Sequence, residues 1–202
     1  LGIFILGTGI VYAADPNGSQ TYSDSIAGLK FSVNFIWTLL GAFLVFSMQA
    51  GFAFLGGFLK QENLLGYLAH CLIDGTLGAI VFFLFGFALM FGGSKLCPGL
   101  DSGNAFVGWD GFFLCGDSYD VQTIMFWLFQ MVFATKTVSI IAGAVAARMK
   151  FVPYLVYSIL MCGIIYPVYG HWVWGGGWLS TLPFGAGVKD FAGCACVPTI
   201  GG

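Results

Sequence analysis

The sequence predicts an all-α, polytopic membrane protein built as a bundle of transmembrane helices. Apolar residues make up 58% of the chain and charged residues only 8%, whereas soluble domains carry about 25% charged residues. The mean hydropathy is +0.91. A net charge of -2 argues against nucleic-acid binding, which needs a basic stripe. We therefore expect an integral protein of a plasma or inner membrane, with the lipid bilayer as its partner.

The first segment, residues 1–14, has the features of a signal peptide. Its apolar run is short for a membrane span and ends in the small residues Ala13 and Ala14, directly before a polar stretch. We predict cleavage of residues 1–14; an additional membrane anchor is the alternative. The transmembrane domain is then expected over residues 30–202, with its fifth span cut short.

Four apolar segments follow, each long enough to cross a bilayer, which takes about 20 residues. Glycines occur throughout them, and small residues let helices approach closely in lipid. The spans should therefore pack tightly. They are expected at residues 35–59, 64–93, 123–147 and 151–170, and a fifth is expected to begin at Asp190.

The charges between the spans predict the orientation. Lys60 lies in one short connection, and Arg148 and Lys150 lie in another. The long connection between them, residues 94–120, holds one lysine and four aspartates. Because lysine and arginine favour the cytoplasmic side, we expect Lys60, Arg148 and Lys150 to face the cytoplasm. The acidic loop and the N-terminus are then outside.

Two cysteines, Cys97 and Cys115, lie in this acidic loop. Oxidising conditions outside the cell allow a disulfide between them, which would stabilise the fold by about 3 kcal/mol. We predict this bridge; two unpaired thiols are the alternative.

Ionisable residues within membrane spans are costly and are candidates for function. His70 and Asp74 are four residues apart, so they share a helix face and could form a hydrogen bond. A buried structural pair that braces helices is favoured over a functional role for these two residues. Lys136 lies near the middle of its span, too deep to reach the interface easily. It continues a helical stripe with Phe129 and Phe133, a pattern that is more often packing than function.

Tryptophans gather after the fourth predicted span, in "GHWVWGGGWLS", at Trp172, Trp174 and Trp178. Tryptophans at this depth usually form an aromatic belt at the membrane interface, but an indole face also attracts cations. On the residues alone both interpretations stay open. Further along, Cys194 and Cys196 form a C-x-C pair, for which helix packing is favoured over metal binding.

Five motifs occur in order along the chain: "FLVFSMQAGFAFLGG", "LIDGTLGAIVFFLFGFALMFG", "FQMVFATKTVSIIAGAVAARMKF", "YPVYGHWVWGGGWL" and "DFAG". Together they resemble the ammonium transporter family (Amt/Mep/Rh), specifically its Amt branch, from Trp37 to Gly202. The resemblance implies a channel-like fold of two inverted helical halves, assembled as a homotrimer, with this chain as the first half. No enzyme activity and no cofactor are implied.

The resemblance also assigns roles to single residues. Trp174 matches the tryptophan that recruits ammonium by cation–π contact, and Phe133 matches the gating phenylalanine, with Phe129 stacked one turn away. Asp190 matches the acid at the start of the fifth span, where a carboxylate can cap the helix. Ala192 matches a position whose carbonyl faces the recruited ion. The implied substrate is ammonium or ammonia, with methylammonium left open.

Three positions depart from the family pattern. The family has a pore-lining histidine where this chain has Pro198, which offers no side-chain donor or acceptor. Lys136 stands where the family has a small or apolar residue and is expected beside the same pore. Ala147 replaces a usual glutamate.

The sequence thus predicts an ammonium-binding membrane transporter or channel that moves ammonium or ammonia. The alternative is a non-conducting ammonium sensor or pseudo-transporter, because the pore histidine is replaced by Pro198. Such a sensor would work with a cytoplasmic regulatory protein or a fused signalling domain.

Overall fold

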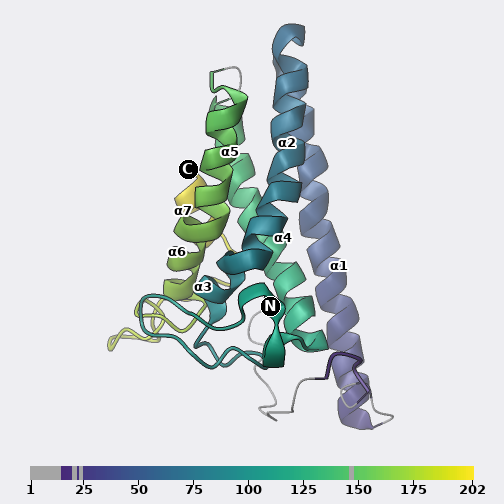
Figure 1. Ribbon diagram of the computed structural model, residues 1–202, viewed down its shortest axis with the longest axis vertical. Coiled ribbons are helices and arrows are strands. Elements are labelled where there is room, and N and C mark those ends of the chain that lie inside the picture. Colours follow the sequence, from purple (N-terminus) through teal and green to yellow (C-terminus); the bar gives the residue numbers. More distant parts are fainter. Residues whose placement is uncertain (1–14, 20–21, 23–24, 146–147) are drawn as a thin grey trace.

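The computed structural model describes residues 15–19, 22, 25–145 and 148–202, and over these residues it is helical, with one isolated β-bridge as its only extended pairing. The predicted signal peptide, residues 1–14, and Ala147 lie outside the described residues. The α-helices are α1 (Ile26–Phe54), α2 (Gln61–Val81), α3 (Phe87–Phe91), α4 (Val121–Val145), α5 (Phe151–Leu160), α6 (Tyr166–Val173) and α7 (Cys196–Gly201) (Figure 1).

Four helical segments are long and apolar enough to cross a membrane, which confirms the predicted all-α polytopic architecture. The first begins at Ile26 rather than at residue 35, because the Ser25 side chain accepts the Gly28 N–H at 3.1 Å and caps the helix. Hydropathy alone detects only the uninterrupted apolar run, which begins several residues after the true start of the helix. The four segments are Ile26–Phe58, Gln61–Phe91, Val121–Val145 and Phe151–Val173.

Two of the spans change helix type near their middle. A π-helical turn, η3 (Phe82–Gly86), joins α2 to α3, and another, η6 (Met161–Ile165), joins α5 to α6. The two turns pack closely: a Cβ added at Gly86 would lie 2.5 Å from the Cys162 carbonyl oxygen, and one at Gly163 would lie 2.3 Å from the Phe85 ring. Glycine at these two positions therefore allows the wide turns to touch.

Helix α4 is the most enclosed of the four spans. In its most apolar stretch 67% of the residues are buried, whereas in the first span only 11% are buried. Figure 1 shows α4 among α1, α2 and α5, with α1 along one side of the bundle. The outward face of α1 is apolar, with exposed side chains such as Val33, Ile36 and Phe43. This face is suited to lipid or to another subunit.

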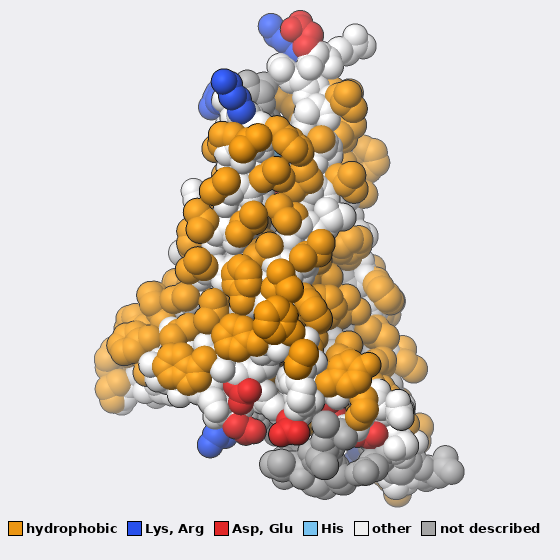
Figure 2. Space-filling model, viewed as in Figure 1, with side chains coloured by type: hydrophobic (Ala, Val, Ile, Leu, Met, Phe, Trp, Pro, Cys, Tyr) orange, Lys and Arg blue, Asp and Glu red, His pale blue; other side chains and the backbone are white. Residues whose placement is uncertain are grey.

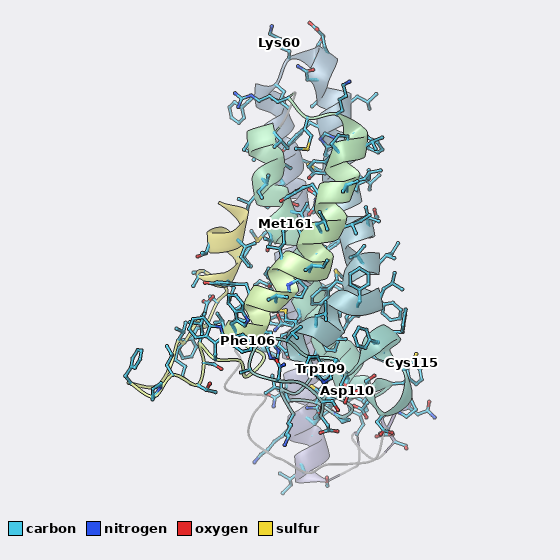
Figure 3. The ribbon with its side chains drawn as sticks, turned by 60° about the vertical axis from the view of Figure 1, so that its left-hand side comes forward. Lys60, Phe106, Trp109, Asp110, Cys115 and Met161 are labelled. Atoms are coloured by element: carbon cyan, nitrogen blue, oxygen red, sulfur yellow. The ribbon has the colours of Figure 1, made fainter. Side chains whose placement is uncertain are left out.

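Charged side chains gather at the two ends of the bundle, and apolar side chains cover the face between them (Figure 2). Figure 3 shows Lys60 at one end and Asp110 and Cys115, from the acidic loop, near the other. The backbone N–H of Asp15 donates to the Asp120 carboxylate at 2.7 Å. The first described residues therefore lie at the acidic end.

The predicted disulfide is wrong, because Cys97 and Cys115 are both free thiols. Cys97 is buried, and burial raises the pKa of its thiol to about 12. Cys115 is exposed and its thiol donates to the Phe113 carbonyl at 3.4 Å. Phe113 and Leu114 both adopt positive φ, 57° and 48°, just before this cysteine. This local turn leaves one thiol in the interior and the other at the surface.

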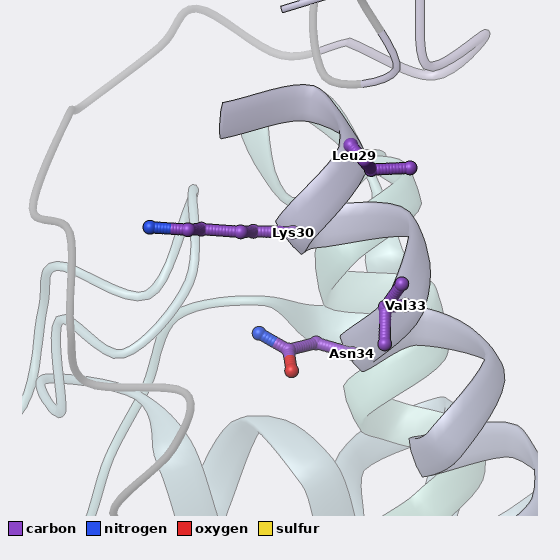
Figure 4. Close-up of a pocket in the computed structure, with 4 residues that line it drawn as sticks. All are labelled: Leu29, Lys30, Val33 and Asn34. Atoms are coloured by element: carbon purple, nitrogen blue, oxygen red, sulfur yellow. The ribbon is translucent and has the colours of Figure 1, made fainter. Parts of the chain in front are cut away.

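A shallow hollow lies near the start of α1 (Figure 4). Its lining residues are Leu29, Lys30, Val33 and Asn34, all from one helix. Lys30 and Asn34 extend to one side, away from Leu29 and Val33. None of the site residues predicted from the sequence lines this hollow, so it is not the candidate site.

Candidate functional site

Three aromatic rings form a column that links α4 to the end of α6. The Phe129 and Phe133 rings lie one helical turn apart, with centroids 5.2 Å apart and an interplanar angle of 66°. The Trp174 ring follows, 6.2 Å from Phe133 at 71°. These edge-to-face arrangements are the ones that aromatic quadrupoles favour. The structure therefore brings together the three aromatic residues singled out in the sequence.

Asp190 joins this column to the start of α7. The Trp174 Nε1–H donates to the Asp190 backbone carbonyl at 2.8 Å. The Asp190 carboxylate accepts the backbone N–H groups of Gly193, Ala195 and Cys196, at 3.0, 3.0 and 2.8 Å. It thus caps the helix, as expected, by satisfying donors that have no partner within it. The helix itself begins at Cys196 rather than at Asp190, because residues 190–195 form the loop that wraps this carboxylate.

Gly193 fits the loop against the aromatic column. It adopts a φ of 81°, in the left-handed region that favours glycine. A Cβ added there would lie 3.3 Å from both the Trp174 and the Phe133 ring. Sequence reasoning did not single out this residue, although it is the glycine of "DFAG". Next to it, Ala192 is exposed.

This arrangement is suited to a small cation. Trp174 is half-buried. Its indole is held in place by its contacts with Asp190 and Phe133, and the part that stays exposed can attract a cation. The nearby Asp190 carboxylate supplies negative potential while its oxygens are occupied by backbone donors. A metal centre has no support in the described residues, where no cluster of three potential His, Cys, Asp or Glu ligands occurs. In the C-x-C pair, Cys194 is exposed and Cys196 is buried.

Pro198 is exposed on the first turn of α7. A proline fits this position because N–H groups in the first turn have no partner within the helix. The next residue continues the helix, since the Thr199 N–H donates to the Ala195 carbonyl at 3.2 Å. Proline therefore occupies this position without disturbing the helical backbone.

Lys136 is buried, with 2% of its surface exposed, and its described side-chain contacts are with α1. Its ammonium group donates to the side-chain oxygen of Gln49 and lies 5.4 Å from the centre of the Phe46 ring, and both partners belong to α1. Along the helix Lys136 is rotated by about 60° from Phe133 and by only about 20° from Phe129. The Phe129 ring also lies near α1, since a Cβ added at Gly41 would be 3.4 Å from it. Lys136 and Phe129 therefore share the side of α4 that faces α1.

Gln49 connects Lys136 to a polar cluster in the interior. The Ser139 hydroxyl lies 3.4 Å from the Gln49 side-chain oxygen and donates to the Asp74 carboxyl at 3.1 Å. The Tyr154 hydroxyl donates to the other Asp74 oxygen at 2.6 Å. Asp74 is fully buried. The cluster therefore links α1, α2, α4 and α5.

The Asp74 carboxyl accepts from Ser139 and Tyr154, and among the described residues no hydrogen bond joins it to His70. The His70 ring stacks on Tyr154 instead, with centroids 4.1 Å apart. Its Nδ1 atom is buried and has no partner among the described residues. The His70 ring therefore packs α2 against α5.

The two neighbouring tryptophans fasten the end of α6 to the acidic loop. The Trp172 Nε1–H donates to the Phe106 carbonyl at 2.9 Å. The Trp178 backbone N–H donates to the Ala105 carbonyl at 3.0 Å. The two rings lie 5.7 Å apart, whereas the column described above contains Trp174 alone of the three.

Comparisons with known proteins agree on one family. The family model described as Ammonium Transporter Family matches residues 36–202. An ammonium transporter Amt2 of Archaeoglobus fulgidus is 43% identical over 196 residues, which are 94% of this chain and 40% of that protein. An ammonium transporter of Bacillus subtilis is 40% identical over 156 residues, 75% of this chain and 37% of that protein. This chain thus spans about two fifths of the length of these curated relatives.

Solved structures match the same fold. A structure titled Sensor Amt Protein has a TM-score of 0.70 and 34% identity, and the match covers 84% of this chain and 42% of that one. Mep2 of Candida albicans has a TM-score of 0.65 and 27% identity, with 81% and 35% of the two chains covered.

Proposed function

Because this chain belongs to the ammonium transporter family, we propose that it is the first half of a membrane protein that binds ammonium at its outer face. The complete protein would move ammonium or ammonia across the membrane. The observation that carries this proposal is the aromatic column ending at Trp174, joined to the Asp190 carbonyl. Methylammonium, a cation of the same charge, is a further substrate to test.

In this proposal Trp174 recruits the cation and Phe133 separates it from the membrane interior, with Phe129 behind it. Asp190 acts through its charge and holds the loop in place. The exposed Ala192 presents its carbonyl to the ion. A cation on an aromatic face gains about 0.5–2 kcal/mol, which is the contribution expected from Trp174.

Replacing Trp174 with leucine in the full-length protein is expected to weaken ammonium binding about twofold to thirtyfold, because the leucine side chain has no quadrupole. Isothermal titration calorimetry of the purified protein measures the affinity. Trp178→Leu is the matched control, since Trp178 lies on the same segment but outside the column, and its affinity should stay unchanged. An unchanged affinity in Trp174→Leu would remove this residue from the site.

We further propose a homotrimer oriented with the acidic loop and the N-terminus outside. The orientation is supported by the charge distribution, with Lys60, Arg148 and Lys150 facing the cytoplasm. The apolar face of α1 can serve contacts with lipid or with another subunit.

The orientation predicts the labelling of single cysteines in intact cells. Cys115 should react with a membrane-impermeant thiol reagent without prior reduction, because it is exposed and free. Cys97 should not react, because it is buried. A cysteine introduced by Lys60→Cys should react only after permeabilisation in a background in which Cys115→Ser and Cys194→Ser remove the two exposed thiols. Labelling of Lys60→Cys in intact cells, with Cys115 silent, would reverse the orientation.

A second candidate function is ammonium sensing without conduction. Pro198 favours it, because the family histidine is absent from this position. A matched solved structure is titled Sensor Amt Protein, and this title is a second reason to consider sensing. A sensor would keep the aromatic column and pass its signal to a cytoplasmic regulatory protein or a fused signalling domain.

A further inference from the structure

His171 is buried, with 1% of its surface exposed, and both its ring nitrogens face backbone carbonyl oxygens. Nδ1 lies 2.8 Å from the Met90 carbonyl oxygen, and Nε2 lies 2.7 Å from that of Asn104. A carbonyl oxygen can only accept a hydrogen bond, whereas a neutral imidazole has one donor and one acceptor. A neutral ring would therefore point a lone pair at one of the two oxygens. Only the doubly protonated ring satisfies both contacts.

The position of the ring in the fold also favours a positive charge. Met90 lies in α3, at the end of the span Gln61–Phe91, and His171 itself lies in the last turn of α6. The C-terminal end of a helix carries about half a negative charge, which attracts cations. The ring thus meets two helix ends of the same sign. Its hydrogen-bond partners among the described residues are the backbone carbonyls of Met90 and Asn104.

The backbone of His171 holds the segment that carries Trp174. Its carbonyl oxygen accepts the N–H groups of Gly175 and Gly177, both at 3.0 Å. The turn closes tightly over the ring, since a Cβ added at Gly175 would lie 2.6 Å from Nδ1. The ring therefore fixes the end of α3, the acidic loop and the turn after Trp174 relative to one another.

We propose that His171 is an imidazolium clamp: it carries a proton on both ring nitrogens and, by tying the acidic loop and α3 to α6, positions Trp174 for ammonium. His171 is a positioning residue that does not touch the ion. The part of the proposal that concerns Trp174 rests on the proposed function, whereas the charge of the ring does not.

Nitrogen-15 NMR of histidine-labelled full-length protein at neutral pH tests the charge directly. The His171 signal, assigned by its loss in His171→Gln, should show two protonated ring nitrogens. If that variant does not fold, the signal is assigned by its loss in the second variant His171→Asn. One protonated and one unprotonated nitrogen at His171 would overturn the clamp. This readout is independent of ammonium, so it stands even if Trp174→Leu leaves affinity unchanged.

Ammonium affinity tests the positioning. His171→Gln keeps one donor and loses the second, and should weaken ammonium binding on the order of tenfold because a charge-assisted bond is lost. Gly175→Ala should weaken ammonium binding to a similar degree. The added Cβ would push the His171 ring from its position, while His171 and Trp174 themselves are not substituted. Trp178→Leu is the control, because the bond from Trp178 to Ala105 comes from its backbone N–H and is kept, and it should change affinity less than threefold. Wild-type affinity in either His171→Gln or Gly175→Ala would overturn the positioning role.

Discussion

Replacing Pro198 with histidine is expected to raise the ammonium-evoked current of the full-length protein on the order of a hundredfold, because a positioned proton-transfer group accelerates such a step by about that factor. This prediction belongs to the sensing function, under which the current of the unaltered protein should be close to background; under the transport function the unaltered protein would already conduct. Proline cannot accept or donate a proton, whereas an imidazole does both near neutral pH. The side chain at position 198 is exposed on α7, so it has room for the larger ring.

Reconstituted proteoliposomes provide the measurement, and Pro198→Ala provides the matched control. Alanine keeps the helical first turn but supplies no imidazole, so its current should stay at background. A robust current from the unaltered protein would contradict the prediction and favour transport by a path that bypasses this position. If current appeared only when Lys136→Ala accompanied Pro198→His, the lysine would also obstruct the path, contrary to its contacts with α1.

Replacing Lys136 with methionine is expected to lower the free energy of unfolding by about 3 kcal/mol, at the low end of the cost of breaking a buried charged cluster. Methionine fills a similar volume but cannot donate to Gln49. The fully buried Asp74 then loses the nearby positive charge and keeps only its hydroxyl donors from Ser139 and Tyr154. The change should therefore loosen the packing of α4 against α1 and α2.

Thermal unfolding of the purified protein in detergent, followed by circular dichroism, shows this loss as a lower midpoint. Lys150→Met makes the same change in composition at an exposed site and should leave the midpoint nearly unchanged. Adding Asp74→Asn to Lys136→Met should recover part of the lost stability. The asparagine carries no charge, so the buried cluster no longer holds an uncompensated carboxylate. Equal losses in Lys136→Met and Lys150→Met would rule out the cluster as their cause.

The four spans and the charge difference between the two ends could be predicted because lipid imposes them locally. Each span needs only a long apolar run, and the charges in each connection lie close together in sequence. The start of α1 was placed too late because one serine cap, at Ser25, outweighs the polar residues that follow it. The disulfide was predicted wrongly because its formation depends on the directions of two side chains, which loop location does not reveal.

The candidate site shows a similar division. The resemblance named Phe129, Phe133, Trp174 and Asp190, and the structure brings them together. The stripe through Lys136 could not reveal that the lysine turns to α1, because that depends on a partner, Gln49, from a distant part of the chain.

Two residues near the site could not be identified from the sequence, because their roles depend on tertiary contacts. Gly193 matters through its fit against two rings, and His171 through carbonyl groups supplied by the loop and by α3. In sequence His171 is only a polar residue within a tryptophan-rich motif.

Each of the two π turns rotates the second half of its span about the helix axis relative to the first half. A π turn holds one residue more than an α turn, so the side chains beyond it are rotated by about 100° relative to an unbroken helix. In both spans the polar cluster lies on one side of the π turn and the contacts of the aromatic column and His171 lie on the other. Deleting one residue from either turn would restore the phase and rotate the outer half of that span away from its partners. Because of this rotation, the inner half of each span can face the polar cluster while the outer half faces the region of the aromatic column and His171. A regular α-helix of the same sequence could not face both.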